Sequence, residues 1–189
     1  MNNIKYSSNY LNGAKILVLG GTGLFAHHLI EEWNSIYERL GIDFSITVCT
    51  RNRSKAIKKH SHLKRNYIEV KEIDFLESQD IYGEYDYIVH MANASAYETF
   101  KGIKQSKKFD ILANSTEAVK NIIRRGGVKR VLFTSSGVAY GNLKDYREEK
   151  LPAVNHLSQD STLGFAKLSS EYQLNTICEE NNVELVIAR

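Results

Sequence analysis

The chain has 189 residues, enough for one domain with a sizeable core and barely enough for two. Its composition, 42% hydrophobic and 25% charged, is that of an ordinary globular protein, and the net charge of +3 is too small to indicate nucleic-acid binding. The sequence contains no apolar run as long as a membrane span, and its first fifteen residues lack the apolar core of a signal peptide. We therefore expect a cytoplasmic protein that binds neither nucleic acid nor a membrane. Cys49 and Cys178 lie far apart and have no metal-ligand spacing, so we expect reduced thiols and no metal site.

Short β-rich runs alternate with helical patterns along the chain. Strands are expected over 15–20, 44–50, 67–73, 85–91, 128–136 and 183–188. Apolar residues at helical spacing predict helices over 25–40, 111–123 and about 161–180. Most of the strands are rich in Val, Ile and Leu without alternation, as strands buried on both faces are. This pattern predicts an α/β fold: a doubly wound parallel sheet of the Rossmann type, with strand order 3-2-1-4-5-6.

Two boundaries follow from the pattern. Residues 1–14 form an N-terminal arm, and residues 15–189 form the Rossmann domain. The chain stops at Arg189, directly after a predicted inner strand, and natural domains seldom end there with nothing covering that strand. We therefore expect the domain to be truncated, with a substrate lobe largely absent.

A glycine-rich turn follows the first predicted strand. Gly21, Gly23 and Ala26 match G-x-G-x-x-G/A, and Gly20 precedes them. In this pattern the glycines let backbone N–H groups approach a pyrophosphate, the small third residue lets the helix pack on its strand, and the helix N-terminus attracts the anion. A turn without a ligand is the alternative, whereas a P-loop is excluded because no Gly-Lys-Ser/Thr follows. The residues expected to contact a dinucleotide are Gly20, Gly21, Thr22, Gly23, Leu24 and Phe25.

The end of the second predicted strand bears on the choice between NAD and NADP. An NAD site usually has an acidic residue there, but Asp43 precedes the strand and Thr50 ends it. Arg51 and Arg53 follow, and an arginine at this place pairs with a 2′-phosphate. We therefore favour NADP over NAD. A solvated basic surface is the alternative, and RNA binding is a remote third.

Several segments, in order, resemble the extended short-chain dehydrogenase/reductases, and within them the NAD-dependent epimerase/dehydratase group that modifies nucleotide sugars. They are GGTGLFA (20–26), IDF (73–75), DYIVHMANAS (86–95), STEAVKNI (115–122), GVKRVLFTSSGVAYG (127–141) and LGFAKLSSEYQL (163–174). The resemblance implies NAD(P) as cofactor, a nucleotide sugar as substrate, hydride transfer at a sugar hydroxyl or keto carbon, and a homodimer.

The same resemblance assigns residues to the cofactor. Asp74 and Phe75 match the pair beside the adenine, although residues 74–77 also fit a helix capping box. The segment that passes under the ribose and nicotinamide is matched by His90, Met91, Ala92, Asn93 and Ala94, with tight packing as the alternative.

The resemblance also places the catalytic residues. Ser136 matches the hydroxyl that bonds the reacting substrate oxygen, with a Ser-rich turn as the alternative. Lys167 matches the lysine of the Tyr-x-x-x-Lys pair, in which the ammonium lowers the pKa of the phenol and holds the nicotinamide ribose. Leu163 stands where the tyrosine belongs, and the family pattern turns the nearest other phenol, Tyr140, away from the lysine. Residues 137–141 lack the acidic groups of dehydratases and decarboxylases, which favours epimerase or ketoreductase chemistry.

Three functions remain open. The first is the NAD(P)-binding domain of a nucleotide-sugar epimerase/reductase-like enzyme, weakly active or inactive because of Leu163. The second is a non-catalytic dinucleotide-binding or sensing protein that has lost the tyrosine. The third, an S-adenosylmethionine methyltransferase, is disfavoured because it would need neither the TSSG segment (134–137) nor Lys167.

Overall fold

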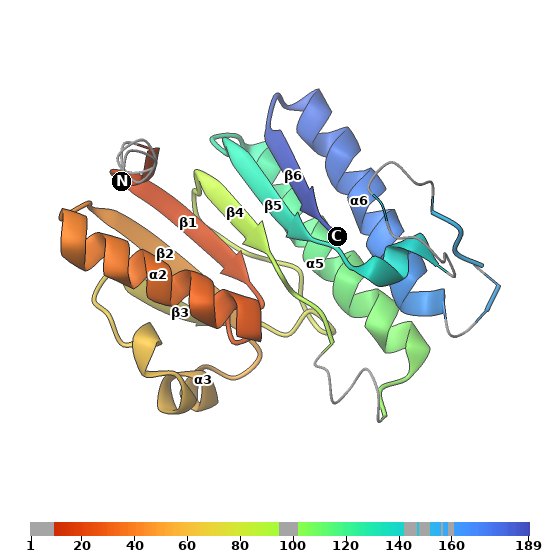
Figure 1. Cartoon of the computed structure of the whole chain (residues 1–189), viewed down its shortest axis with the longest axis horizontal. Coiled ribbons are helices and arrows are strands. Elements are labelled where there is room, and N and C mark those ends of the chain that lie inside the picture. Colours follow the sequence, from red (N-terminus) through yellow and green to blue (C-terminus); the bar gives the residue numbers. More distant parts are fainter. Residues whose placement is uncertain (1–9, 95–101, 142–146, 148–151, 156, 159–160) are drawn as a thin grey trace.

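The computed structural model describes residues 10–94, 102–141, 147, 152–155, 157–158 and 161–189. Six strands form one sheet in the order β3-β2-β1-β4-β5-β6, and every neighbouring pair is parallel (Figure 1). The strands are β1 (Ala14–Leu19), β2 (Phe44–Thr50), β3 (Ile68–Glu72), β4 (Tyr87–His90), β5 (Arg130–Thr134) and β6 (Glu184–Ala188). The predicted Rossmann sheet and its strand order are confirmed.

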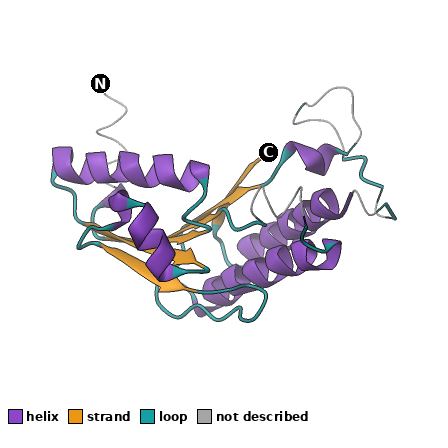
Figure 2. Ribbon diagram, turned by 90° about the horizontal axis from the view of Figure 1, so that it is seen from below, coloured by secondary structure: helices purple, strands orange, loops and turns teal. Residues whose placement is uncertain are grey.

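Helices cover the two faces of the sheet. They are α2 (Leu24–Leu40), α3 (Arg53–Lys59), α5 (Gln105–Arg125) and α6 (Thr162–Glu180), with short 3₁₀ turns η1 (Ser61–Leu63) and η2 (Gly137–Tyr140). Figures 1 and 2 show α2 and α3 on one side of the sheet and α5 and α6 on the other. Among the described residues, no helix is both long and apolar enough to cross a membrane.

The core consists of two apolar clusters separated by the sheet. Leu17 and Leu19 of β1 point into the cluster that α5 and α6 cover, whereas Ile16 and Val18 point into the cluster beneath α2. All four side chains are buried. A central strand with helices on both faces needs apolar residues at every position, which explains the unbroken apolar runs of the sequence.

Several element boundaries differ from the sequence-based expectation. The strand expected over 128–136 spans only Arg130–Thr134, because the chain turns into η2 at Ser136, whose hydroxyl accepts a hydrogen bond from Val138 N (3.4 Å). The apolar pattern did not predict α3. Its signal is Asn52, whose side chain caps the helix by accepting from Lys55 N (2.7 Å).

The last strand is the edge of the sheet. Leu185 and Ile187 of β6 pack against the cluster under α5 and α6. On the opposite face Val186 is 42% exposed, so this face of β6 is open within the described part of the chain.

Candidate functional site

The carboxyl ends of β1 and β4 lie side by side at the centre of the sheet (Figure 1). The chain leaves β1 towards α2 on one face, and α5, which lies between β4 and β5 in the sequence, packs on the other face. In open α/β sheets such a reversal leaves a crevice outside the strand ends, and ligands bind there. The predicted glycine turn therefore lies at the expected place for a dinucleotide.

Gly20 brings two segments of backbone close together. Its φ of +80° lies in the left-handed region, and a Cβ on it would come within 2.7 Å of Met91 O and 2.8 Å of Ala92 N. A Cβ on Gly21 would likewise collide with Val48 Cγ1 in β2. Side chains at these two positions would push the turn away from β4 and β2, so only glycine allows the observed packing.

The N-terminus of α2 opens onto this edge of the sheet. Gly23 is its N-cap and supplies no side-chain acceptor, and the first turn of the helix contains no acidic residue. Leu24 and Phe25 are 71% and 76% exposed, whereas Ala26 is buried and packs with the strands. The helix dipole and the uncapped N–H groups favour an anion at this place.

The end of β2 carries a guanidinium group. Arg51 directly follows the strand and is exposed. Arg53 is held against β3 instead, since its Nε donates to Val70 O (3.1 Å) and its backbone N donates to Glu72 Oε2 (2.8 Å). Asp43 lies at the opposite end of the sheet, where its carbonyl accepts from Gly13 N (2.6 Å). Arg51 stays the candidate contact for a 2′-phosphate because of its place directly after β2.

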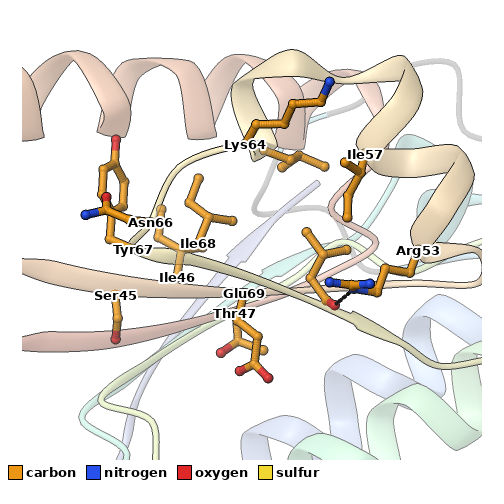
Figure 3. A pocket seen from close by; sticks show the side chains of 12 residues that line it. Ser45, Ile46, Thr47, Arg53, Ile57, Lys64, Asn66, Tyr67, Ile68 and Glu69 are labelled. Carbon is orange, nitrogen blue, oxygen red and sulfur yellow. Dashed lines mark hydrogen bonds between the residues drawn. The ribbon is translucent and has the colours of Figure 1, made fainter.

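A cavity of about 460 Å³ lies beside β3, between this edge strand and α3 (Figure 3). Its lining includes Tyr67 and Ile68 of the β3 region and Arg53 and Ile57 of α3. Of the residues considered for the dinucleotide, Arg53 alone lines it, and its side chain is bonded to Val70 O. It is therefore separate from the site at the glycine turn.

The segment after β3 forms a turn. Asp74 Oδ1 accepts from Leu76 N (2.9 Å), and Asp74 O accepts from the N–H groups of Glu77 and Ser78. The Asp74 side chain thus closes an Asx turn with Leu76 N rather than a capping box with Glu77 N, and no helix follows. Phe75 is buried in the cluster under α5. Contact of this pair with adenine stays a prediction.

The segment after β4 continues along the glycine turn. Met91 N donates to Leu19 O (2.9 Å), which extends the β1–β4 pairing by one residue. Ala92 is buried, and Asn93 is exposed with its Oδ1 accepting from Ala94 N (2.9 Å). The predicted cofactor residues from β1 and β4 thus lie together at one edge.

Lys167 lies on α6 with its ammonium against the end of β5. Nζ donates to Thr134 O (2.6 Å) and lies 4.8 Å from the centre of the Phe133 ring. Burial lowers its pKa to about 8, although the neighbouring Glu171 carboxylate acts in the opposite direction. Leu163 lies one turn earlier on the same helix and carries no titratable proton. Of the Tyr-x-x-x-Lys pair, the chain thus has the lysine, Lys167, but Leu163 replaces the tyrosine.

Sequence reasoning did not predict an ionic network beside Ser136. The buried carboxylate of Glu171 accepts from the Ser135 hydroxyl and from Arg189 Nε (3.1 and 3.2 Å to its two oxygens). The hydrogen bond to Glu171 raises the pKa of Arg189, whose guanidinium lies 5.0 Å from the centre of the Tyr140 ring. Tyr140 is thus packed with Arg189 at the end of β6.

His90 was expected only as part of the segment beneath the cofactor, and its buried polar contacts were not predicted. His90, the last residue of β4, has its Nε2 3.3 Å from Ser115 Oγ and 3.5 Å from Thr116 Oγ1. Thr116 in turn donates to Ser170 Oγ of α6 (2.9 Å). Burial, and secondarily the charge of Lys167, lower the pKa of His90 to about 3. The available signal was Ser115, a polar residue within the apolar stripe of α5.

Comparisons with known proteins agree with this arrangement. The model of the NAD dependent epimerase/dehydratase family matches residues 16–189. UDP-glucuronic acid 4-epimerase from Bacillus cereus, solved with UDP-glucuronic acid and NAD, superposes with a TM-score of 0.68 at 18% identity, over 92% of this chain and 55% of that chain. UDP-N-acetylglucosamine 4-epimerase from Methanobrevibacter ruminantium M1, solved with UDP-N-acetylmuramic acid, gives 0.71 at 18% identity, over 94% and 54%. The Bordetella bronchiseptica enzyme WbmF, solved with NAD+ and UDP, gives 0.68 at 16% identity, over 95% and 50%.

The chain spans about half the length of these solved structures, and at such identities their likeness shows the fold alone. A search of curated proteins finds no match. The family match, by contrast, covers nearly the whole chain and includes the glycine turn, the β4 end and Lys167. The chain belongs to the NAD dependent epimerase/dehydratase family.

Proposed function

We propose that this chain is the NAD(P)-binding domain of a nucleotide-sugar epimerase- or reductase-like protein. The observation that carries the proposal is the close approach of Gly20 to Met91 and Ala92, directly before the uncapped N-terminus of α2. This combination makes a cradle for a pyrophosphate at the reversal point of the sheet. The family match supports it, and the similar UDP-glucuronic acid 4-epimerase was solved with UDP-glucuronic acid and NAD.

In this proposal, different groups of residues bind different parts of the dinucleotide. The glycine turn and the first turn of α2 hold the pyrophosphate, and Arg51 and Asp74 lie on the adenosine side. Met91, Ala92 and Asn93 line the path towards the nicotinamide end, where Lys167 bonds the ribose. A homodimer and a cytoplasmic location belong to the same proposal and rest on the family resemblance.

The chemistry that a bound nicotinamide supplies is hydride transfer to or from a carbon of the sugar. Ser136 is the N-cap of η2, two residues after β5, and offers a hydroxyl that would bond the reacting oxygen. Lys167 is buried, with a pKa lowered to about 8, so its ammonium is still mainly charged at neutral pH. Proton transfer at the substrate oxygen needs a further titratable group, and Leu163 does not provide one.

Arg51 is the residue proposed to discriminate between NADP and NAD. We propose that its guanidinium favours NADP, although two of the similar structures were solved with NAD. Titrations of NADPH and NADH with the native chain, Arg51→Ala and the matched control Lys58→Ala test this. A charge-assisted contact of about 1.5–3 kcal/mol predicts that Arg51→Ala weakens NADPH binding about 10- to 150-fold and leaves NADH unchanged. Equal losses for both dinucleotides, or the same loss in Lys58→Ala, would contradict the assignment.

Substitution of Leu163 distinguishes an enzyme from a protein that only binds the dinucleotide. General acid–base catalysis contributes about 10²–10⁴-fold to rate, so we expect the native chain to have little or no redox turnover with nucleotide sugars. In a chimera that adds the carboxy-terminal half of a UDP-sugar 4-epimerase, Leu163→Tyr should raise turnover by about that factor. Robust turnover of the native chain that Tyr140→Phe abolishes would show that Tyr140 is the catalytic phenol.

A second function, non-catalytic binding or sensing of the dinucleotide, is favoured by the same leucine. Saturable NAD(P)H binding together with no gain of turnover in Leu163→Tyr would support it. Turnover that depends on neither Leu163 nor Tyr140 would exclude both functions as described.

A further inference from the structure

Three histidines converge on the α2 side of the sheet, away from Lys167 and Ser136. His27 lies on the first turns of α2, His60 joins α3 to η1, and His62 lies in η1. The ring centres of His27 and His62 are 4.3 Å apart, and those of His60 and His62 are 5.4 Å apart. One ligand nitrogen from each ring can lie within 4.8 Å of the other two. Residues from two separate segments thus form one imidazole cluster.

The closest pair already has nearly the spacing that a metal ion imposes. His27 Nδ1 and His62 Nδ1 are 3.0 Å apart. In a tetrahedral zinc site with metal–nitrogen distances of about 2.0–2.1 Å, two ligand nitrogens lie about 3.3 Å apart. His60 is half-buried, and it offers a third ligand nitrogen within 4.8 Å of those of His27 and His62.

Glu31 orients the first of these rings. Its Oε2 lies 3.2 Å from His27 Nε2, one turn along α2. An ionised carboxylate only accepts hydrogen bonds, so in the neutral ring Nε2 carries the proton and Nδ1 keeps its lone pair towards His62. Metal-binding histidines are held in this way, with the second ring nitrogen donating to a carboxylate.

The surroundings hold His62 and also give access to it. Asn34 Nδ2 donates to His62 O (3.0 Å), which fixes η1 against α2. The Nε2 of the buried His62 ring has no hydrogen-bond partner among the described residues. A groove of about 440 Å³, lined among others by Glu31, Glu38 and His62, opens between α2 and η1 and provides a path for an ion.

We propose that His27, His60 and His62 bind one divalent transition-metal ion of the zinc class, with Glu31 as the positioning residue of His27 and water in the fourth position. Imidazole nitrogen suits zinc, copper and nickel rather than magnesium or calcium. The sequence led us to expect no metal site, because its two cysteines have no metal-ligand spacing; His27 and His60 lie 33 positions apart. The bound ion joins the start of α2 to the segment that follows Arg51, and the proposal does not depend on the proposed function.

Calorimetric titration of zinc into the untagged, chelator-treated 189-residue chain tests this proposal. The expected result is one ion per chain, a cobalt-substituted form with the visible absorption of a tetrahedral site, and a Tm that rises with zinc concentration. His60→Gln and His62→Gln should weaken binding by more than 10-fold, and Glu31→Gln by about 10-fold. His28→Gln is the matched control, because His28 lies next to His27 on α2 but outside this cluster.

His60→Gln is the decisive variant, because its half-buried side chain can be changed with the least risk to folding. The Tm of each variant in chelator shows whether the fold is kept, and Glu31→Gln replaces any variant that fails this check. A native chain that does not bind one zinc ion, or a His60→Gln variant that binds it as tightly as the native chain, would overturn the proposal. So would an equal loss in His28→Gln, because that result assigns the ion to His27, His28 and Glu31 instead.

Discussion

His90 is fully buried, and no acidic group of the described residues stabilises a positive charge on its ring. Its ring lies between Ser115 and Thr116, whose hydroxyls are neutral, and the ammonium of Lys167 adds to the cost of protonation. The pKa therefore falls from 6.5 to about 3 in the folded chain. Between these values the unfolded chain binds a proton that the folded chain does not, so stability is complete above pH 6.5 and decreases as the pH falls towards 3.

This shift predicts a measurable pH dependence. At pH 5, about 1.5 units below the unfolded value, His90 should reduce the free energy of unfolding by about 2 kcal/mol. Urea unfolding of the native chain and of His90→Asn at pH 7.5 and pH 5 measures the effect. The native chain should lose about 2 kcal/mol more than the variant, whereas equal losses would show that His90 is not the group responsible.

At the scale of elements, α6 carries Lys167 and Leu163 and depends on a close contact with η2. Gly164 lies in its first turn, where a Cβ would meet Val138 O. Lys167 and Glu171 follow on the same helix and reach Thr134 and Ser135 at the end of β5. The position of the Lys167 ammonium thus depends on how closely the start of α6 approaches η2.

Gly164→Ala should therefore destabilise the fold and also weaken dinucleotide binding. Overpacking of this kind costs about 1–3 kcal/mol, because the helix has to move away from the η2 backbone. Gly102→Ala is the matched control, since nothing lies within 4 Å of a Cβ there, and it should change stability by less than about 0.5 kcal/mol. Denaturant unfolding of both variants measures the difference, and similar losses in the two would contradict the close-contact account.

At the scale of the whole molecule, the sequence predicted what local patterns determine. The strand order followed from alternating strands and helices, and the glycine turn was found because its spacing is local. The pairing of His90 with Ser115 was not predicted, because the partners come from β4 and α5, 25 residues apart. The Glu171–Arg189 pair and the histidine cluster were missed for the same reason: each depends on which segments the fold brings together.

The central claim is that a dinucleotide pyrophosphate lies at the N-terminus of α2, and Gly23 tests it most directly. Gly23 is exposed, its φ of −74° suits any residue, and aspartate at an N-cap is at least as stabilising as glycine. The measurement is the affinity of NADH and NADPH for Gly23→Asp relative to Gly23→Ala, together with the Tm of both. If the account is right, Gly23→Asp keeps or raises the Tm and weakens binding of both dinucleotides more than 10-fold beyond Gly23→Ala, because its carboxylate repels the pyrophosphate. Dinucleotide binding that is equally tight in the aspartate and alanine variants, or no binding by the native chain, would contradict it.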